Sequence, residues 1–137
     1  MADLLNTMKI SGAGMRVQSE RVRVIAQNMA NADTAPSKPG ELPYTRKTIT
    51  FKNQLDREVG EKLVQVDKIE QDTSKDYVMK YMPGHPAADA DGYVMMPNVT
   101  SLIEMMDMRE ASKSYEANLN MYTQTRDMAS KTIDILR

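Results

Sequence analysis

A seven-residue repeat of apolar side chains runs through the last third of the sequence. One row consists of Met105, Ser112, Leu119, Arg126 and Ile133, and a second row, three residues later, of Met108, Tyr115, Tyr122, Ala129 and Leu136. Steps of three and four residues place both rows on one face of a helix, as in a coiled coil. The expected start is Thr100 or Ser101, with Glu104 completing a capping box. A helix over residues 100–136 would be roughly 55 Å long, nearly twice the diameter of a small domain. One small globule cannot bury it, so other surfaces must cover it.

The same period occurs at the start of the sequence and predicts a helix over residues 3–32. One row holds Met1, Met8, Met15, Val22 and Met29, and the other holds Leu4, Ser11, Gln18, Ile25 and Ala32. Gly12 and Gly14 each cost about 1 kcal/mol relative to Ala in a helix, which indicates a break or a close helix–helix approach near residues 11–14. Pro36 and the polar residues before it end the helix.

The two helices share a period, and we therefore expect them to pair as a coiled coil. The C-terminal helix is the longer of the two, and Ile103 and Met106 widen its apolar stripe beyond a narrow seam. Part of that stripe is therefore expected to stay uncovered within one chain.

Strand and turn signals are concentrated between the helices. Residues 35–43 hold three prolines and a glycine, which predicts a surface loop. Residues 44–52 alternate as a half-buried strand does, 63–69 and 77–81 do so more weakly, and 82–98 are expected to be irregular. The predicted fold is therefore mainly α and forms one structural unit. It has a core helix in 1–33, a small β-rich or irregular insert in 34–99 and a long core helix in 100–137.

Composition excludes several classes of protein. A net charge of −1 lacks the electrostatic footprint of a nucleic-acid binder. The absence of Cys excludes a disulfide scaffold, a thiolate zinc site and a cysteine nucleophile. No apolar run approaches the ~18 residues of a membrane span, and the first residues are not typical of a cleaved secretory signal. The protein is expected to stay in the cell or to leave it without a cleaved peptide.

Candidate catalytic and metal-binding residues are few. His85 has Asp89 and Asp91 nearby, but no second imidazole, thiolate or nucleophile accompanies it. The Asp-Ala-Asp-Gly run that ends at Gly92 is expected to form a turn, because carboxylates are missing from the first and last positions of a calcium loop. With no phosphate-binding loop or serine elbow either, we expect no enzyme activity, metal, cofactor or small-molecule substrate.

Three segments resemble bacterial flagellar rod and hook proteins. Residues 19–34 contain Ala-Gln-Asn-Met-Ala-Asn-Ala-Asp-Thr, which is similar to the amino-terminal signature of that family. Residues 84–99, Gly-His-Pro-Ala-Ala-Asp-Ala-Asp-Gly-Tyr-Val-Met-Met-Pro-Asn-Val, resemble a loop particular to the proximal rod. Residues 104–118 resemble the carboxy-terminal helix of the family.

The resemblance implies a structural subunit of the proximal rod of the flagellar basal body. Such subunits form a helical tube across the periplasm with their own copies and with other proximal and distal rod proteins. They contact the rod-base adaptor and the membrane-ring protein, transmit torque towards the hook, and leave the cell unfolded through the flagellar type III export apparatus. An alternative from the residues alone is a cytoplasmic coiled-coil adaptor or an export-chaperone-like binding module.

The helical rows and the resemblance together predict the residues used in assembly. They are Met8, Met15, Val22, Ile25, Asn28, Met29, Asn31, Tyr93, Pro97, Asn98, Met105, Met108, Tyr115, Asn118, Leu119, Tyr122, Ile133 and Leu136. Among them Tyr115, Leu119 and Tyr122 are expected to contribute most, because large side chains dominate interface energetics.

Overall fold

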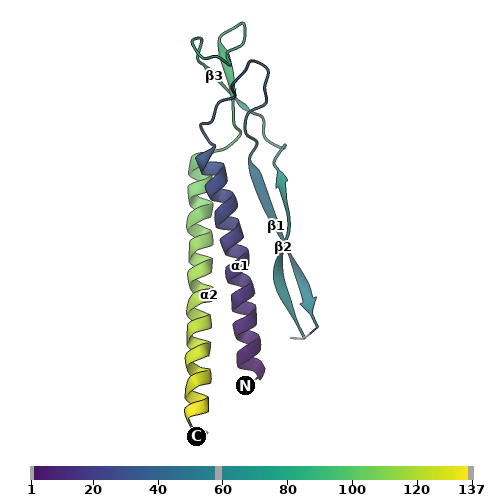
Figure 1. The fold of residues 1–137 in the computed structure, drawn as a ribbon, viewed down its shortest axis with the longest axis vertical. Helices are drawn as coiled ribbons and strands as arrows, with labels where there is room; N and C mark the ends of the chain where they lie inside the picture. The colour runs from purple at the N-terminus through teal and green to yellow at the C-terminus, as the bar shows by residue number, and fades with distance from the viewer. Residues whose placement is uncertain (1, 58–59, 136–137) are drawn as a thin grey trace. The chain divides into compact units, whose positions relative to one another are not determined.

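In the computed structural model, which describes residues 2–57 and 60–135, one long helix precedes a β insert in the sequence and another follows it (Figure 1). The elements, in chain order, are α1 (Ala2–Ala30), β1 (Lys47–Asp56), β2 (Glu61–Gln71), β3 (Val78–Tyr81), β4 (Tyr93–Met96) and α2 (Ser101–Ile135). β1 pairs with β2, and β3 pairs with β4, as separate two-stranded sheets. The expected helix–insert–helix order is confirmed. Leu136 lies outside the described residues.

The chain divides into two compact units, and both helices run through both of them. Unit 1 comprises Met1–Val22, Ile49–Lys68 and Arg109–Arg137, and unit 2 comprises Arg23–Thr48 and Ile69–Met108. Unit 1 therefore holds the first part of α1, the last part of α2 and most of the β1–β2 ribbon. Unit 2 holds the two helix ends at which the chain enters and leaves the insert, together with the β3–β4 hairpin.

In unit 1 the helices run antiparallel and approach closely at Gly14. A Cβ added to Gly14 would lie 2.8 Å from Nδ2 of Asn118. About two turns further along α1, Arg21 pairs with Glu110 at 3.3 Å. α1 is continuous through residues 11–14, so the predicted close approach is confirmed and no break occurs.

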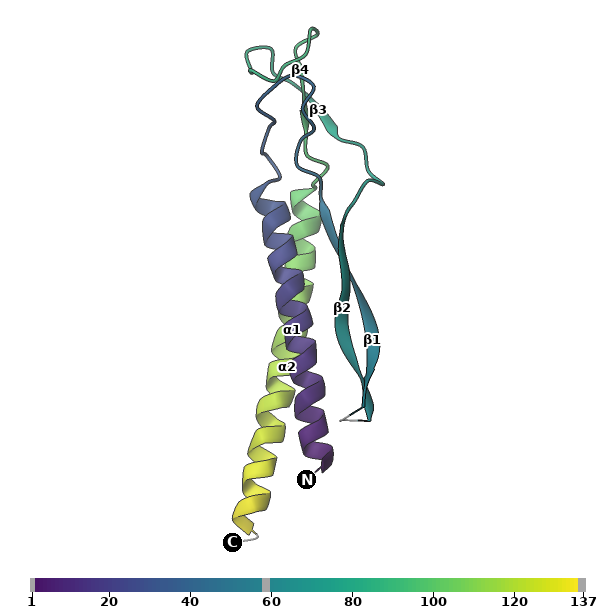
Figure 2. The ribbon, with the colours of Figure 1, turned by 45° about the vertical axis from the view of Figure 1, so that its right-hand side comes forward.

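α1 also buries a second face, which the sequence analysis missed. In unit 1, α1 lies between α2 and the β1–β2 ribbon (Figure 1, Figure 2). Ala13 and Val17 are buried, as is Leu63 on β2, and all three line one cavity of about 320 Å³. Ile10, Val17 and Val24 recur every seven residues, and that spacing could have revealed the face.

The buried row of α2 differs from the first of the two rows predicted for this helix. Glu104, Ala111 and Thr125 are buried, whereas Met105, Leu119 and Ile133 are 55%, 40% and 53% exposed. The first predicted row thus lies one residue beyond the buried row. On α1 the second predicted row contains the buried residues Ser11 and Ile25. The fully buried residues of this α2 row are therefore small or polar, whereas α1 also buries Ile25.

In unit 2, residues 82–98 are more regular than expected. β4 pairs antiparallel with β3, with Val78 opposite Met96 and Tyr81 opposite Tyr93, so a wholly irregular segment was the wrong prediction. The two tyrosine rings meet edge to face with centroids 5.3 Å apart. Gly92 precedes β4 with φ of 84°, and a Cβ there would lie 2.9 Å from the Tyr81 ring. Turn geometry and packing both require glycine at this position.

Replacing the two glycines of α1 with alanine should have different effects on the free energy of unfolding. Gly12→Ala should raise the free energy of unfolding by about 1 kcal/mol through helix propensity, because a Cβ at Gly12 meets nothing within 4 Å. Gly14→Ala should not be stabilised in this way. The new Cβ would displace the Asn118 side chain and break its 2.9 Å hydrogen bond to the Ser114 carbonyl, which offsets the gain in helix propensity. Urea unfolding measures both variants. Equal stabilisation by the two alanines would contradict the close approach.

Candidate assembly surfaces

α2 carries a series of large apolar side chains that are exposed in the described part of the chain. Tyr115 and Leu119 are 38% and 40% exposed, and Met121 and Met128 are 52% and 55% exposed. The first pair lies on one side of the row that contains Ala111 and Thr125, and the second pair lies on the other. Steps of +1 and +4 residues from that row rotate one way about the helix axis, whereas steps of +3 rotate the other way. Near the start of the helix Leu102 and Met106 are 67% and 65% exposed. Exposed apolar side chains in such a long series are typical of an interaction surface.

The remaining predicted helix residues are less exposed. Met8, Met15, Val22 and Met29 form a half-buried row on α1, and Met108, Asn118 and Tyr122 are half-buried on α2. Ile25 is buried. Among the predicted helix residues, those best placed to meet another molecule are therefore on α2.

Unit 2 contains a buried polar cluster centred on Asn28. The Asn28 amide is 1% exposed, and its Nδ2 donates to the Lys47 carbonyl at 2.8 Å and to Glu104 at 3.1 Å. Its Oδ1 accepts from the Lys47 N–H at 2.9 Å and from the Tyr44 hydroxyl at 2.9 Å. One side chain of α1 thus fixes both the start of β1 and the first turn of α2.

Arg46 joins this cluster to the end of the ribbon. Its Nε donates to Glu104, whose side chain is 1% exposed, and its other nitrogens reach Asp72 at 3.4 Å and Asp107 at 3.6 Å. Burial lowers the pKa of Arg46, but hydrogen bonds and charge from Glu104, and then from Asp72, outweigh burial and raise it. Burial, with Glu104 nearby, raises the pKa of the Tyr44 hydroxyl. Glu104 was predicted as a capping-box residue; its carboxylate instead holds Arg46 and Asn28.

Asn98 completes the cluster just before α2. Its Oδ1 accepts from the Arg46 N–H at 2.8 Å, and its Nδ2 donates to the carbonyls of Asp72 at 2.8 Å and Lys75 at 3.1 Å. Hydrogen bonds from the Ser74 hydroxyl and N–H lower the pKa of Asp72. Asn98 is 5% exposed, so it fastens the two chain segments that lead into and out of the insert.

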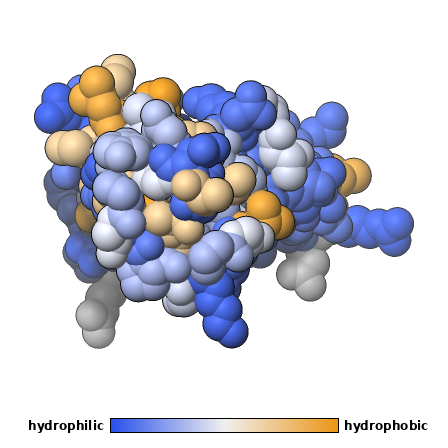
Figure 3. All heavy atoms as spheres, turned by 90° about the horizontal axis from the view of Figure 1, so that it is seen from above, coloured by the Kyte–Doolittle hydropathy of each residue, from blue (hydrophilic) through white to orange (hydrophobic). Residues whose placement is uncertain are grey.

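The other predicted residues of unit 2 vary in exposure. Asn31 is half-buried and donates to the Gln27 carbonyl at 2.8 Å. Pro97 is buried, whereas Tyr93 is 43% exposed. The surface that carries β3 and β4 shows small hydrophobic groups among hydrophilic ones (Figure 3). Asn28, Pro97 and Asn98 make their contacts within the chain, and their role in assembly stays a prediction.

His85 and its acidic neighbours form turns. Nδ1 of His85 accepts from the Ala87 N–H at 3.1 Å. Asp89 accepts from the N–H groups of Asp91 at 3.0 Å and Tyr93 at 2.8 Å, the turn predicted there. Over residues 2–57 and 60–135 no cluster of three acidic or histidine side chains is arranged to bind a metal. No helix in that part of the chain has an apolar stretch suited to crossing a bilayer.

Comparison with known proteins identifies the family. The family model described as "Flagellar basal body rod FlgEFG protein C-terminal" matches residues 90–135. The chain is 50% identical over 137 residues to the flagellar basal-body rod protein FlgC of Agrobacterium fabrum, covering 100% of this chain and 98% of that relative. It is 39% identical over 134 residues to FlgC of Yersinia enterocolitica and 37% identical over 134 residues to FlgC of Salmonella typhimurium, covering 96% of this chain and 97% of each relative. The chain therefore belongs to the family of FlgC flagellar basal-body rod proteins.

Proposed function

We propose that this chain is a subunit of the proximal rod, built into a helical tube that spans the periplasm and transmits torque from the membrane ring towards the hook. Family membership makes it a structural rod protein and not an enzyme. Copies of itself and the neighbouring proximal and distal rod proteins are its proposed partners, with the rod-base adaptor and the membrane-ring protein at one end. It reaches them unfolded through the flagellar type III export apparatus, and motility requires it.

The uncovered apolar flanks of α2 are the observation that carries this proposal. Contact between two different patches on neighbouring copies is heterologous and gives open-ended growth, as a rod needs. Permanent interfaces commonly bury 2,000 Å² or more, and 35 residues of helix offer a long surface for such contacts. Torque would then be spread over many contacts, since single surface ion pairs contribute about 1 kcal/mol or less.

Basal-body purification from a strain in which an epitope-tagged copy replaces the gene tests the proposal. We expect the tagged chain to co-purify with basal bodies, and deletion of the gene to abolish both rod completion and swimming. A chain that stays in the soluble fraction while basal bodies assemble normally would contradict the proposal and favour a cytoplasmic adaptor.

A further inference from the structure

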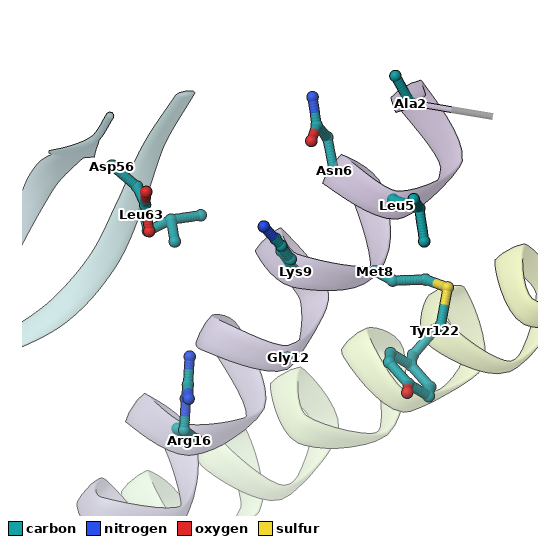
Figure 4. Close-up of a pocket in the computed structure, with 10 residues that line it drawn as sticks. All are labelled: Ala2, Leu5, Asn6, Met8, Lys9, Gly12, Arg16, Asp56, Leu63 and Tyr122. Atoms are coloured by element: carbon teal, nitrogen blue, oxygen red, sulfur yellow. The ribbon is translucent and has the colours of Figure 1, made fainter. Parts of the chain in front are cut away.

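A groove of about 710 Å³ lies in unit 1 along the first turns of α1 (Figure 4). Leu5 and Met8 on α1, Leu63 on β2 and Tyr122 on α2 give it apolar walls. Met8 points towards α2, where Tyr122 lies, while Lys9 and Arg16 project on the side of the strands (Figure 4). Its volume falls in the range of 300–1,000 Å³ typical of pockets that bind ligands.

Gly12 keeps this groove open. A Cβ on Gly12 would meet nothing within 4 Å, and Gly12 is not among the glycines with positive φ. Glycine in a helix interior costs about 1 kcal/mol relative to Ala. Neither backbone geometry nor packing within the chain requires this cost, which is explained if the space receives a side chain from another molecule.

The groove combines apolar walls with a net positive charge, because Lys9 and Arg16 outnumber its one carboxylate, that of Asp56. Within the described part of the chain neither Lys9 nor Arg16 forms an ion pair. A segment that fills the groove should therefore carry aliphatic side chains beside a negative charge.

The end of α2 has this combination. Because Gly14 lies opposite Asn118 in antiparallel helices, Ala2 lies opposite about residue 130, and the last turn of α2 extends past α1. Ile133 and Ile135 there are 53% and 84% exposed. Asp134 adds a negative charge, and no basic residue in that turn compensates the negative pole of the helix.

We propose that the groove receives the last turn of α2 from a second copy of this chain, with Ile133 or Ile135 against its apolar walls and Asp134 near Lys9 and Arg16. This inference rests on the proposed function, because it defines one contact between neighbouring rod subunits. A chain cannot fill its own groove in this way. Gly12 lies opposite about residue 120 of its own α2, so Ile135 is roughly 20 Å further along that helix.

Disulfide crosslinking in purified basal bodies tests the contact, and the chain has no natural Cys to interfere. The variant Gly12→Cys/Ile135→Cys should form covalent multimers of this chain after mild oxidation. The roughly 20 Å separation within one chain far exceeds the 7 Å limit for Cα atoms bridged by a disulfide, so every bond must join two copies. The control Gly12→Cys/Lys113→Cys should give at least ten-fold less multimer.

Filling the groove is an independent measurement. Gly12→Phe should leave the chain folded, as judged by circular dichroism, but should reduce its incorporation into basal bodies at least ten-fold, whereas Gly12→Ala, which adds only a methyl group, should reduce it by a smaller factor. This pair decides the question if the double-cysteine variant fails to assemble. A charge exchange adds a third measurement: Lys9→Glu/Arg16→Glu should impair assembly, and adding Asp134→Lys should restore part of it.

The outcomes separate this inference from the proposed function. An unsubstituted chain that is absent from basal bodies contradicts the proposed function. A chain that is present there but forms no 12–135 crosslink and tolerates Gly12→Phe contradicts only the groove contact. A photo-crosslinking amino acid at position 12 that captures a different rod protein, and no second copy of this chain, would overturn the choice of a second copy as occupant.

Discussion

Leu119→Asp should prevent the chain from entering the basal body while leaving its own fold intact. Leu119 is 40% exposed, so the substitution removes only part of the stabilisation that a fully buried leucine would contribute, and circular dichroism of the isolated chain checks that it still folds. In an assembled rod the new carboxylate would be desolvated without a partner, which costs several kcal/mol. At 1.4 kcal/mol per factor of ten, incorporation should fall at least a hundred-fold. Immunoblots of purified basal bodies and swimming assays measure this loss.

Asn120→Asp is the matched control for this variant. It places the same charge one residue further along α2, on an exposed polar position outside both apolar rows. It should assemble and swim nearly as the unsubstituted chain does. Normal rod incorporation and motility of Leu119→Asp would show that the exposed flank is not an assembly surface.

Glu104→Ala should have the largest effect on the stability of the isolated chain. It removes the buried partner of Arg46 and one acceptor of Asn28. Breaking a buried ion pair costs about 3–5 kcal/mol, and the lower end is expected here because Asp72 and Asp107 remain 3.4 and 3.6 Å from Arg46. With a urea dependence of about 1–3 kcal/mol/M, the unfolding midpoint should fall by at least 1 M. Urea titration followed by circular dichroism measures the shift.

Two further variants isolate the buried charge. Glu110→Ala removes a carboxylate that also binds an arginine, Arg21, but whose side chain is 69% exposed, so it should cost less than about 1 kcal/mol. The double variant Arg46→Met/Glu104→Leu removes both charges and should recover much of the stability lost in Glu104→Ala. If Glu104→Ala and Glu110→Ala lower the midpoint equally, the cluster does not stabilise the fold as argued.

The helices were predictable because their side-chain period depends on local geometry. The face of α2 that turns inward was not. A sequence shows that Met105, Leu119 and Ile133 share a face, but it does not show whether that face meets α1 or another molecule. In a chain that assembles, the largest apolar row can remain for neighbours while Ala111 and Thr125 allow close packing within the chain.

The polar cluster could not be predicted from the sequence for a different reason. Asn28, Arg46 and Glu104 lie far apart in the sequence, and each has a common local explanation: a helix residue, a residue before a strand and a capping acid. Only tertiary structure brings them within hydrogen-bond distance. Likewise β4 was missed because Pro97 and Gly92 border a strand of only four residues, and its pairing with β3 decides its conformation.

Because the inner row of α2 is small and polar while its flanks are large and apolar, substitutions on the two surfaces have separate consequences. In the proposed assembly, a change at Leu119 or Met128 would alter which neighbour the helix accepts without disturbing the register set by Asn28 and Gly14. Related rod subunits can therefore diverge in their choice of neighbour while they retain one common fold.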